Sequence, residues 1–273
     1  MATTIDTSTA ASDGLTEHSA AAVKPGKLFR AGAAGISFRE RFVHDRANLQ
    51  FLDCGEYDIP ADGCSSWFGV PGRECLLFMW KGAARVEMRD ASYDLAPYDT
   101  LYIPLGAAFR LRNQTAEPAR IIQTSAPAVN VHPVFHSRFV EFSRREDRIR
   151  HLKGKEVYLM FDVSEAADKL VAGYTFYQSY TRAWPPHNHT DQEETYIFIK
   201  GHGAMEVYET PETMSFVHSV DEGDLVTIPF LNYHPVFSQE DPLEFIWCIA
   251  GERYWVGDKN KDFMKGTGPA ITT

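Results

Sequence analysis

An internal repeat constrains the fold of this chain more than any other feature of its sequence. Residues 73–82 (RECLLFMWKG) align with residues 192–201 (QEETYIFIKG) at an offset of 119 positions, and both segments end in Lys-Gly. Residues 102–106 (YIPLG) align with residues 227–231 (TIPFL) at an offset of 125 positions. Such self-similarity is typical of a duplicated folding unit, so we expect two successive domains of the same fold.

Both copies consist of short apolar segments that are separated by Gly, Pro, Asp and Asn. In the first copy, strand-length segments lie at residues 76–80, 84–88 and 100–103, and an aromatic one lies at residues 172–182 of the second copy. Short strands with turn residues between them are typical of a β-sandwich or a β-barrel. The sequence therefore predicts an all-β protein.

The second copy contains a group of residues with the spacing of metal ligands. Residues 187–201 fit the pattern H-x-H-x4-E-x6-G, which begins with His187 and His189 and continues to Glu194. On an extended strand His187 and His189 would share one face, because successive side chains point to opposite sides. A turn at residues 190–193 would then bring Glu194 back towards both histidines.

A second motif supplies a fourth candidate ligand. Residues 223–234 (GDLVTIPFLNYH) fit the pattern G-x5-P-x4-H, which ends at His234. Three imidazoles and one carboxylate leave coordination positions open, which favours a catalytic site over a closed structural one. This ligand set suits one divalent ion of Mn, Fe, Co, Ni or Zn, and the ligands do not choose among them.

Two residues next to this motif are candidates for catalysis. Tyr196 lies two positions after Glu194, so both side chains should face the same side of a strand together with Phe198, whereas Ile197 should face the other side. The Tyr196 phenol could hydrogen-bond a substrate oxygen or relay a proton, or it could only fill the interior. Glu193 is the alternative base, although strand alternation turns it away unless the strand is bulged.

The first copy lacks the ligands. Through the two offsets, the four ligand positions correspond to Phe68, Val70, Cys75 and Phe109. We therefore expect a single metal, in the second copy. The first copy should be structural, either packing against the second barrel or forming a subunit contact in a homo-oligomer.

These observations divide the chain into four parts. We predict a flexible tail at residues 1–26, a first barrel without metal ligands at 27–128, a linker at 129–156, and a metal-binding barrel at 157–273. The linker carries an arginine-rich segment at residues 142–151 (FSRREDRIRH), which we interpret as a solvated connector. A role of these arginines in binding an anionic substrate is the less favoured alternative.

Charge and cysteine content limit the partners of the protein. The formal net charge of −10 argues against nucleic acid and anionic membranes as partners, although a local field can still favour a small anionic substrate. The four cysteines form no C-x-x-C pair, which fits the reducing cytoplasm. No apolar run approaches the length of a membrane span.

The two motifs together resemble the paired motifs of the cupin superfamily, with Leu231 in place of a turn glycine. Residues 185–189 (PPHNH) resemble P-P-H-K-H of 5-deoxyglucuronate isomerase from inositol catabolism. Residues 245–252 (FIWCIAGE) resemble F-I-W-G-M-A-G-E of 5-keto-4-deoxyuronate isomerase from pectin catabolism. The R-R-x-E-x-Y segment of that enzyme corresponds to residues 191–196 (DQEETY) here, without the arginines. The resemblance covers most of residues 28–257.

This resemblance implies a bicupin, with two tandem double-stranded β-helix (jelly-roll) barrels, and an isomerase of a keto- or deoxy-uronate. An open divalent metal can chelate adjacent oxygens of such a carbohydrate and acidify the C–H bond between them, and a base then moves the proton. We therefore predict a metal-dependent aldose–ketose isomerase of carbohydrate metabolism. The alternatives are an Fe- or Cu-dependent cupin dioxygenase and a non-catalytic sugar-binding bicupin.

Overall fold

The computed structural model describes residues 28–30, 35–183, 186–210 and 212–252. The tail predicted at residues 1–26 and the end of the second barrel beyond residue 252 lie outside the described residues. Within the described part, the regular structure is almost entirely β-strand, with a short α-helix and two 3-10 turns. This confirms the predicted all-β class.

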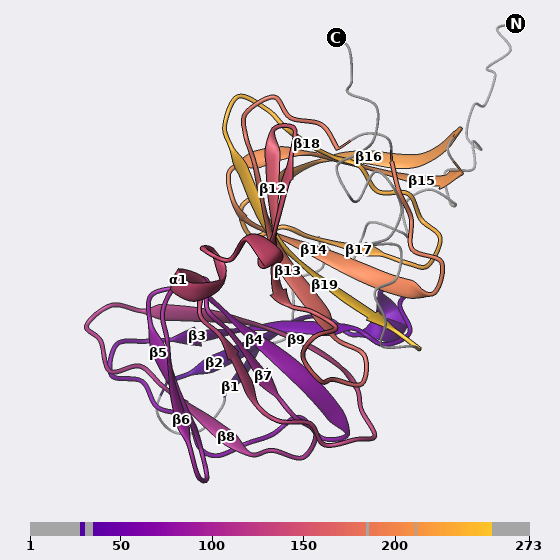
Figure 1. The fold of residues 1–273 in the computed structure, drawn as a ribbon. Helices are drawn as coiled ribbons and strands as arrows, with labels where there is room; N and C mark the ends of the chain where they lie inside the picture. Colours follow the sequence, from indigo (N-terminus) through magenta and orange to yellow (C-terminus); the bar gives the residue numbers. More distant parts are fainter. Residues whose placement is uncertain (1–27, 31–34, 184–185, 211, 253–273) are drawn as a thin grey trace, which may run out of the picture.

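The first half of the chain forms a larger sheet in the order β1-β2-β3-β9-β4-β7-β10 and a smaller sheet in the order β6-β5-β8 (Figure 1). Neighbouring strands pair antiparallel. The elements of this half are β1 (Leu28–Arg30), β2 (Ser37–Phe42), η2 (His44–Arg46), β3 (Asp53–Ile59), β4 (Arg73–Lys81), β5 (Ala84–Met88), β6 (Ser92–Leu95), β7 (Thr100–Ile103), β8 (Phe109–Arg112), β9 (Ala119–Pro127) and β10 (Phe135–Ser137).

The second half repeats this arrangement with a larger sheet in the order β11-β12-β13-β19-β14-β17 and a smaller sheet in the order β16-β15-β18. After the short connecting elements α1 (Phe139–Phe142) and η3 (Glu146–Arg148), the strands are β11 (Ile149–Leu152), β12 (Lys155–Phe161), β13 (Val171–Tyr177), β14 (Gln192–Lys200), β15 (His202–Thr210), β16 (Thr213–Asp221), β17 (Leu225–Ile228), β18 (Val236–Ser238) and β19 (Leu243–Gly251). The order β3-β9-β4-β7 of the first half thus matches β13-β19-β14-β17 of the second, as the sequence repeat predicts.

Buried side chains fall into three clusters: one inside each barrel, and one between the larger sheets of the two halves. Strand β14 shows how alternation produces this, because Tyr196 and Phe198 face the interior of the second barrel. Ile197 and Ile199 face the cluster between the sheets, as the sequence predicts. Both faces of the central strands are therefore buried, which holds the barrels back to back.

The two larger sheets also meet through polar contacts. The Thr124 hydroxyl of β9 donates to Cys248 Sγ of β19 at 3.2 Å, and Trp80 Nε1 of β4 donates to the carbonyl of Ile199 at 3.1 Å. Burial raises the pKa of Cys248 to about 12, so its thiol stays protonated.

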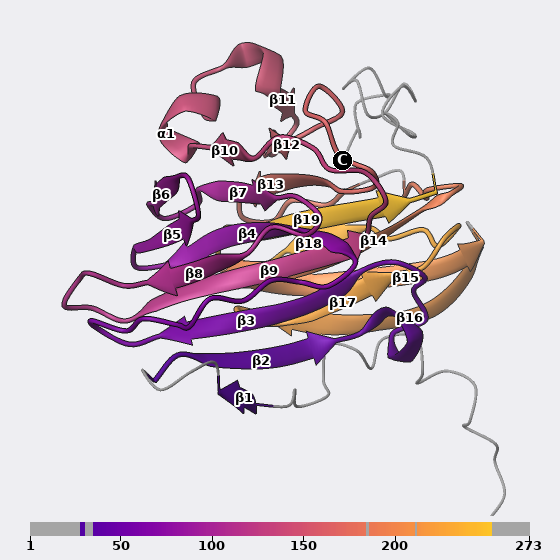
Figure 2. The same cartoon turned by 90° about the horizontal axis from the view of Figure 1, so that it is seen from below.

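The segment predicted as a linker, residues 129–156, contributes strands to both halves. Within it, β10 pairs with β7 at the edge of the first larger sheet, and β11 pairs with β12 at the edge of the second. Figure 2 shows β10, α1 and β11 together along one side of the molecule. The connection is thus an ordered part of both sheets, and β11 reaches the site described next.

Candidate active site

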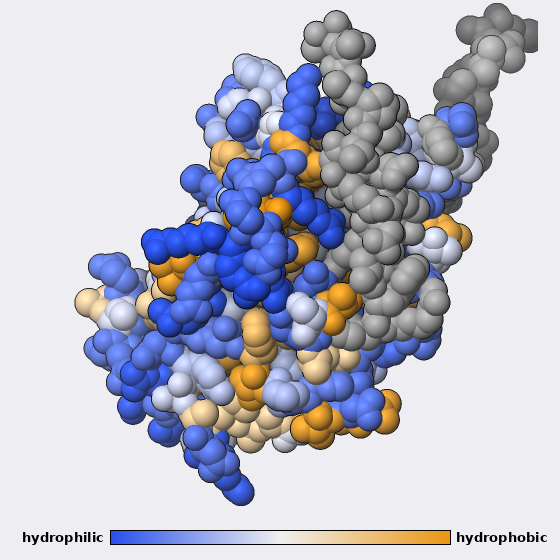
Figure 3. All heavy atoms as spheres, viewed as in Figure 1, coloured by the Kyte–Doolittle hydropathy of each residue, from blue (hydrophilic) through white to orange (hydrophobic). Residues whose placement is uncertain are grey.

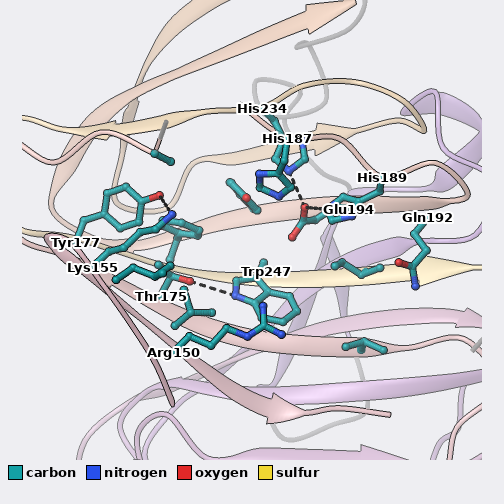
Figure 4. A pocket seen from close by; sticks show the side chains of 17 residues that line it. Arg150, Lys155, Thr175, Tyr177, His187, His189, Gln192, Glu194, His234 and Trp247 are labelled. Atoms are coloured by element: carbon teal, nitrogen blue, oxygen red, sulfur yellow. Dashed lines mark hydrogen bonds and ion pairs between the residues drawn. The ribbon is translucent and has the colours of Figure 1, made fainter. Parts of the chain in front are cut away.

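The four predicted ligands converge at one end of a cavity inside the second barrel (Figure 4). Strand β14 positions Glu194, and the turn between β17 and β18 positions His234. The loop before β14 positions His187 and His189. One ligand atom from each residue lies within 4.8 Å of the others, and all except the half-buried His187 are buried.

The structure differs from the sequence prediction in the local conformation of the two histidines. They lie in a loop rather than on a strand, because Pro186 has no N–H with which to continue a ladder. The chain keeps an extended path beside the turn that carries His234. The backbone N–H of Leu231 donates to the carbonyl of His189 at 2.8 Å, and that of His234 donates to the carbonyl of His187 at 3.3 Å.

The hydrogen-bond geometry of the cluster fits a bound cation. Glu194 Oε2 lies 3.0 Å from Nε2 of both His189 and His234. His234 Nδ1–H donates to the carbonyl of Asn232 at 2.8 Å, so in the neutral ring Nε2 carries the lone pair and faces the carboxylate. This buried Nε2 has no hydrogen bond of acceptable geometry in the described structure. Lone pairs that converge in this way suit a divalent metal, and the hydrogen bond from His234 Nδ1–H to Asn232 fixes the orientation of that imidazole.

Glu194 is held in its ionised form. Burial raises the pKa of this carboxyl, but the contacts from His189 and His234 outweigh burial, and the pKa lies below its ordinary value. The cluster therefore offers a carboxylate, which is the form that coordinates a metal.

Tyr196 lies in the same cavity. Its ring makes an edge contact with His234, with the ring centroids 5.6 Å apart, and it packs against Phe245 at 4.6 Å. Burial and the nearby charge of Glu194 raise the pKa of the Tyr196 phenol well above its ordinary value. The phenol therefore stays protonated and can act as a hydrogen-bond donor.

Glu193 does not reach the cavity. Its side chain is 1% exposed and points out of the second barrel into the first half of the chain. There the carboxylate accepts the backbone N–H groups of Gln50, Phe51 and Leu52 at 2.6–2.9 Å. Strand alternation is undisturbed at this position, so the alternative base is turned away from the substrate space.

The wall of the cavity is largely apolar. Phe245, Trp247 and Ile249 of β19 line it together with Val157 and Val171. Trp247 Nε1 donates to Thr175 Oγ1 at 3.2 Å, which fixes the indole ring within this wall.

Arg150 of the arginine-rich segment lines the cavity, as the less favoured alternative for that segment allowed. Sequence reasoning missed four other polar residues that line it: Lys155, Thr175, Tyr177 and Gln192. No motif marks them. The signal that could have identified the two cations is the alternation of residues 149–157, which becomes informative only when the pairing of β11 with β12 is known.

The equivalent space in the first barrel is filled with apolar side chains. The rings of Phe68 and Phe109 lie 4.5 Å apart, and Cys75 is buried beside them. Val70 packs against the same cluster. Across the described ranges, the His187–His234 group is the cluster able to hold a metal, and none lies in the first barrel.

Fold and site together define a bicupin whose second barrel carries a cluster of three histidines and one glutamate. The model of the KduI/IolB family matches residues 42–265. Because this match spans most of the sequence, the chain belongs to the KduI/IolB family, a family of uronate-type sugar isomerases.

Solved structures share this fold. An IolB-like protein from Salmonella typhimurium is 18% identical with a TM-score of 0.66, and the alignment covers 82% of this chain and 91% of that one. A putative glyoxylate-induced protein from Pseudomonas aeruginosa is 12% identical with a TM-score of 0.67, covering 84% and 85%. A variant of oxalate decarboxylase from Bacillus subtilis is 14% identical with a TM-score of 0.68, covering 84% and 76%. No curated protein sequence matches the chain.

Among the helices of the described residues, none has the length and apolar character needed to span a membrane.

Proposed function

We propose that this protein is a metal-dependent isomerase that interconverts the aldose and ketose forms of a uronate-type sugar acid. The observation that carries the proposal is the His187, His189, Glu194 and His234 cluster at the end of a largely apolar cavity. Membership of the KduI/IolB family supports the reaction class.

The four residues of the cluster would hold one divalent ion. When bound, such an ion supplies a Lewis acid that polarises adjacent hydroxyl and carbonyl oxygens of a sugar. The hydrogen bond from His234 Nδ1–H to the carbonyl of Asn232 would hold the His234 imidazole in the orientation that directs Nε2 towards the ion. The ionised Glu194 would contribute a negative charge that offsets part of the positive charge of the ion.

Tyr196 acts on the substrate in this proposal. Its protonated phenol donates a hydrogen bond to a carbonyl oxygen of the substrate, which stabilises negative charge on that oxygen. The apolar residues of β19 exclude water from the same space, which strengthens that hydrogen bond. Glu193 takes no part in the proton transfer, because its carboxylate is bound at the contact between the halves.

The experiment uses the purified protein after its own metal has been identified. It is incubated with uronates, keto-uronates and neutral ketoses under strict anaerobiosis, and the products are identified. We expect interconversion of a sugar acid without oxygen, and loss of that turnover in Glu194→Gln.

Two results would overturn the proposal. Turnover that needs oxygen and consumes it in proportion to product would favour the dioxygenase. Binding of sugars by the metal-replete protein with no turnover of any panel member would favour a non-catalytic sugar-binding protein.

A further inference from the structure

Two cationic residues line the cavity on the wall that β11 and β12 form. In this hairpin Arg150 pairs with Val157, and Leu152 pairs with Lys155, and all four side chains line the cavity. Lys155 is thus the diagonal neighbour of Arg150, and backbones in such pairs lie about 7–8 Å apart, within reach of long side chains. His151 lies on the opposite, exposed face of β11.

Neither cation forms an ion pair with a carboxylate of the described residues. Arg150 makes no hydrogen bond or ion pair with any described residue, and Asp162 acts on it through its charge alone. Lys155 Nζ contacts the Tyr177 hydroxyl at 3.4 Å. The lysine also faces the Tyr177 ring, with Nζ 5.3 Å from the ring centroid.

Four other basic residues of the same connecting segment are paired. Arg138 binds Glu141, Arg145 binds Asp147, Arg148 binds Glu165, and His151 contacts Glu146 and Glu156. Figure 3 shows hydrophilic residues gathered on this side of the molecule, between the two halves. The two cations that line the cavity thus lack the ion pairs that these four neighbours form.

The charge inside the cavity favours an anion. Glu194 is the carboxylate of its lining, and its oxygen is already engaged by His189 and His234. Burial lowers the pKa of Arg150 and lowers that of Lys155 to about 8, which is the electrostatic cost of two cations without a partner. An anionic ligand group would offset that cost.

We propose that Arg150 and Lys155 form the site that binds the carboxylate of the substrate. Lys155 and Tyr177 lie at the end of the cavity opposite the four-residue cluster (Figure 4). The sugar acid therefore binds with its carboxylate towards β11 and β12 and with its carbonyl end towards His187 and Glu194. This inference rests on the proposed function for the identity of the carbonyl end.

The test measures binding by calorimetry to zinc-loaded protein, with D-glucuronate, D-glucose and D-glucose 6-phosphate as probes. The variants Arg150→Met and Lys155→Met remove the charge and keep an apolar stem. The matched controls are Arg144→Met and Lys153→Met, which change exposed residues of the same segment. Zinc content and melting temperature are measured for every protein to establish that each variant is folded.

We expect wild-type protein to bind glucuronate at least about 10-fold more tightly than glucose, as a charge-assisted contact provides. Each cavity variant should lose most of this preference while its zinc content stays unchanged, and both controls should retain it. The inference is overturned if the cavity variants keep the wild-type preference, if glucose binds as tightly as glucuronate, or if the phosphate is preferred to the carboxylate.

Activity separates this inference from the proposed function. If the protein isomerises no sugar, but the carboxylate preference is lost in Lys155→Met, the binding site stands and the reaction does not. If sugar acids are isomerised equally by wild type and Lys155→Met, the reaction stands and the carboxylate site does not.

Discussion

Glu74 and Glu193 occupy equivalent positions in the two halves, and each binds backbone N–H groups of the other half. The Glu193 carboxylate accepts those of residues 50–52, and the Glu74 carboxylate accepts those of residues 168–170 at 2.8–3.0 Å. Glu74 also accepts the Tyr102 hydroxyl at 2.6 Å. The two glutamates are therefore a reciprocal pair of contacts that orient one barrel against the other.

Replacement of either glutamate by glutamine should destabilise the protein. The new amide N–H2 would face backbone N–H groups, so buried donors would lose their acceptor, at about 2–4 kcal/mol in the free energy of unfolding. Chemical denaturation of Glu74→Gln and Glu193→Gln measures this loss. Glu117→Gln is the control, because Glu117 is exposed. A change below about 0.5 kcal/mol in both variants, as for surface substitutions, would show that these contacts contribute little.

The chain should bind one metal ion, in the second barrel. Phe68 and Phe109 fill the equivalent space of the first barrel, and no ligand set replaces the four lost there among the described residues. Elemental analysis should give one ion per chain, and Glu194→Gln or His234→Ala should weaken binding. Circular dichroism should show the fold retained in both variants, because the apolar cluster of the second barrel stabilises it without metal. Two tightly bound ions per chain, or unfolding on ligand loss, would contradict this prediction.

Tyr196→Phe should lower kcat by about 100-fold, the scale of one acid–base contribution, with little change in KM or in metal content. The ring and its packing against Phe245 are retained in this variant, so only the hydroxyl is removed. Steady-state kinetics with metal analysis tests the prediction. Unchanged kinetics would mean that Tyr196 only fills the cavity.

Carboxylate binding should weaken as pH rises through about 8, where Lys155 loses its proton. The groups that face Lys155 are Tyr177 on β13, Arg150 diagonally on β11, and Glu194 and Tyr196 on β14 across the cavity. Calorimetric affinity for glucuronate at pH 7 to 10 should fall in wild type, whereas Lys155→Met should show a flatter profile. Identical profiles would contradict the assignment of Lys155.

The same lowered pKa affects stability with a defined sign. Between about pH 8 and the ordinary lysine value of 10.5, the unfolded chain holds more protons at Lys155 than the folded chain. The contribution of this residue to stability should therefore rise with pH across that window. The difference in free energy of unfolding between wild type and Lys155→Met measures it, and a difference that falls across the window would contradict the sign.

The spacing of His187, His189, Glu194 and His234 in the sequence predicted that their side chains cluster. Extended segments joined by tight turns place residues of such spacing on the same face. Alternation along β14 likewise placed Glu194 and Tyr196 on one side and Glu193 on the other. The loop conformation of His187 was missed because the strand pattern does not continue through Pro186, which has no N–H for a ladder hydrogen bond.

The cations of the cavity could not be predicted in the same way. Arg150 lies among arginines of similar sequence context, and only the pairing of β11 with β12 turns its side chain inward. The partners of Glu193 are likewise more than 140 positions away in the sequence. Long-range pairing decides both cases, and the single sequence carries no signal for it.

Solvent-deuterium incorporation during anaerobic turnover tests the proposed isomerisation most directly. The metal-loaded protein is incubated in D2O with its sugar-acid substrate, and the product is analysed by NMR while oxygen is excluded. The account predicts continued interconversion, with deuterium at the carbon next to the carbonyl and no net oxidation. Turnover that stops without oxygen, and consumes oxygen in proportion to product when it is restored, would contradict it.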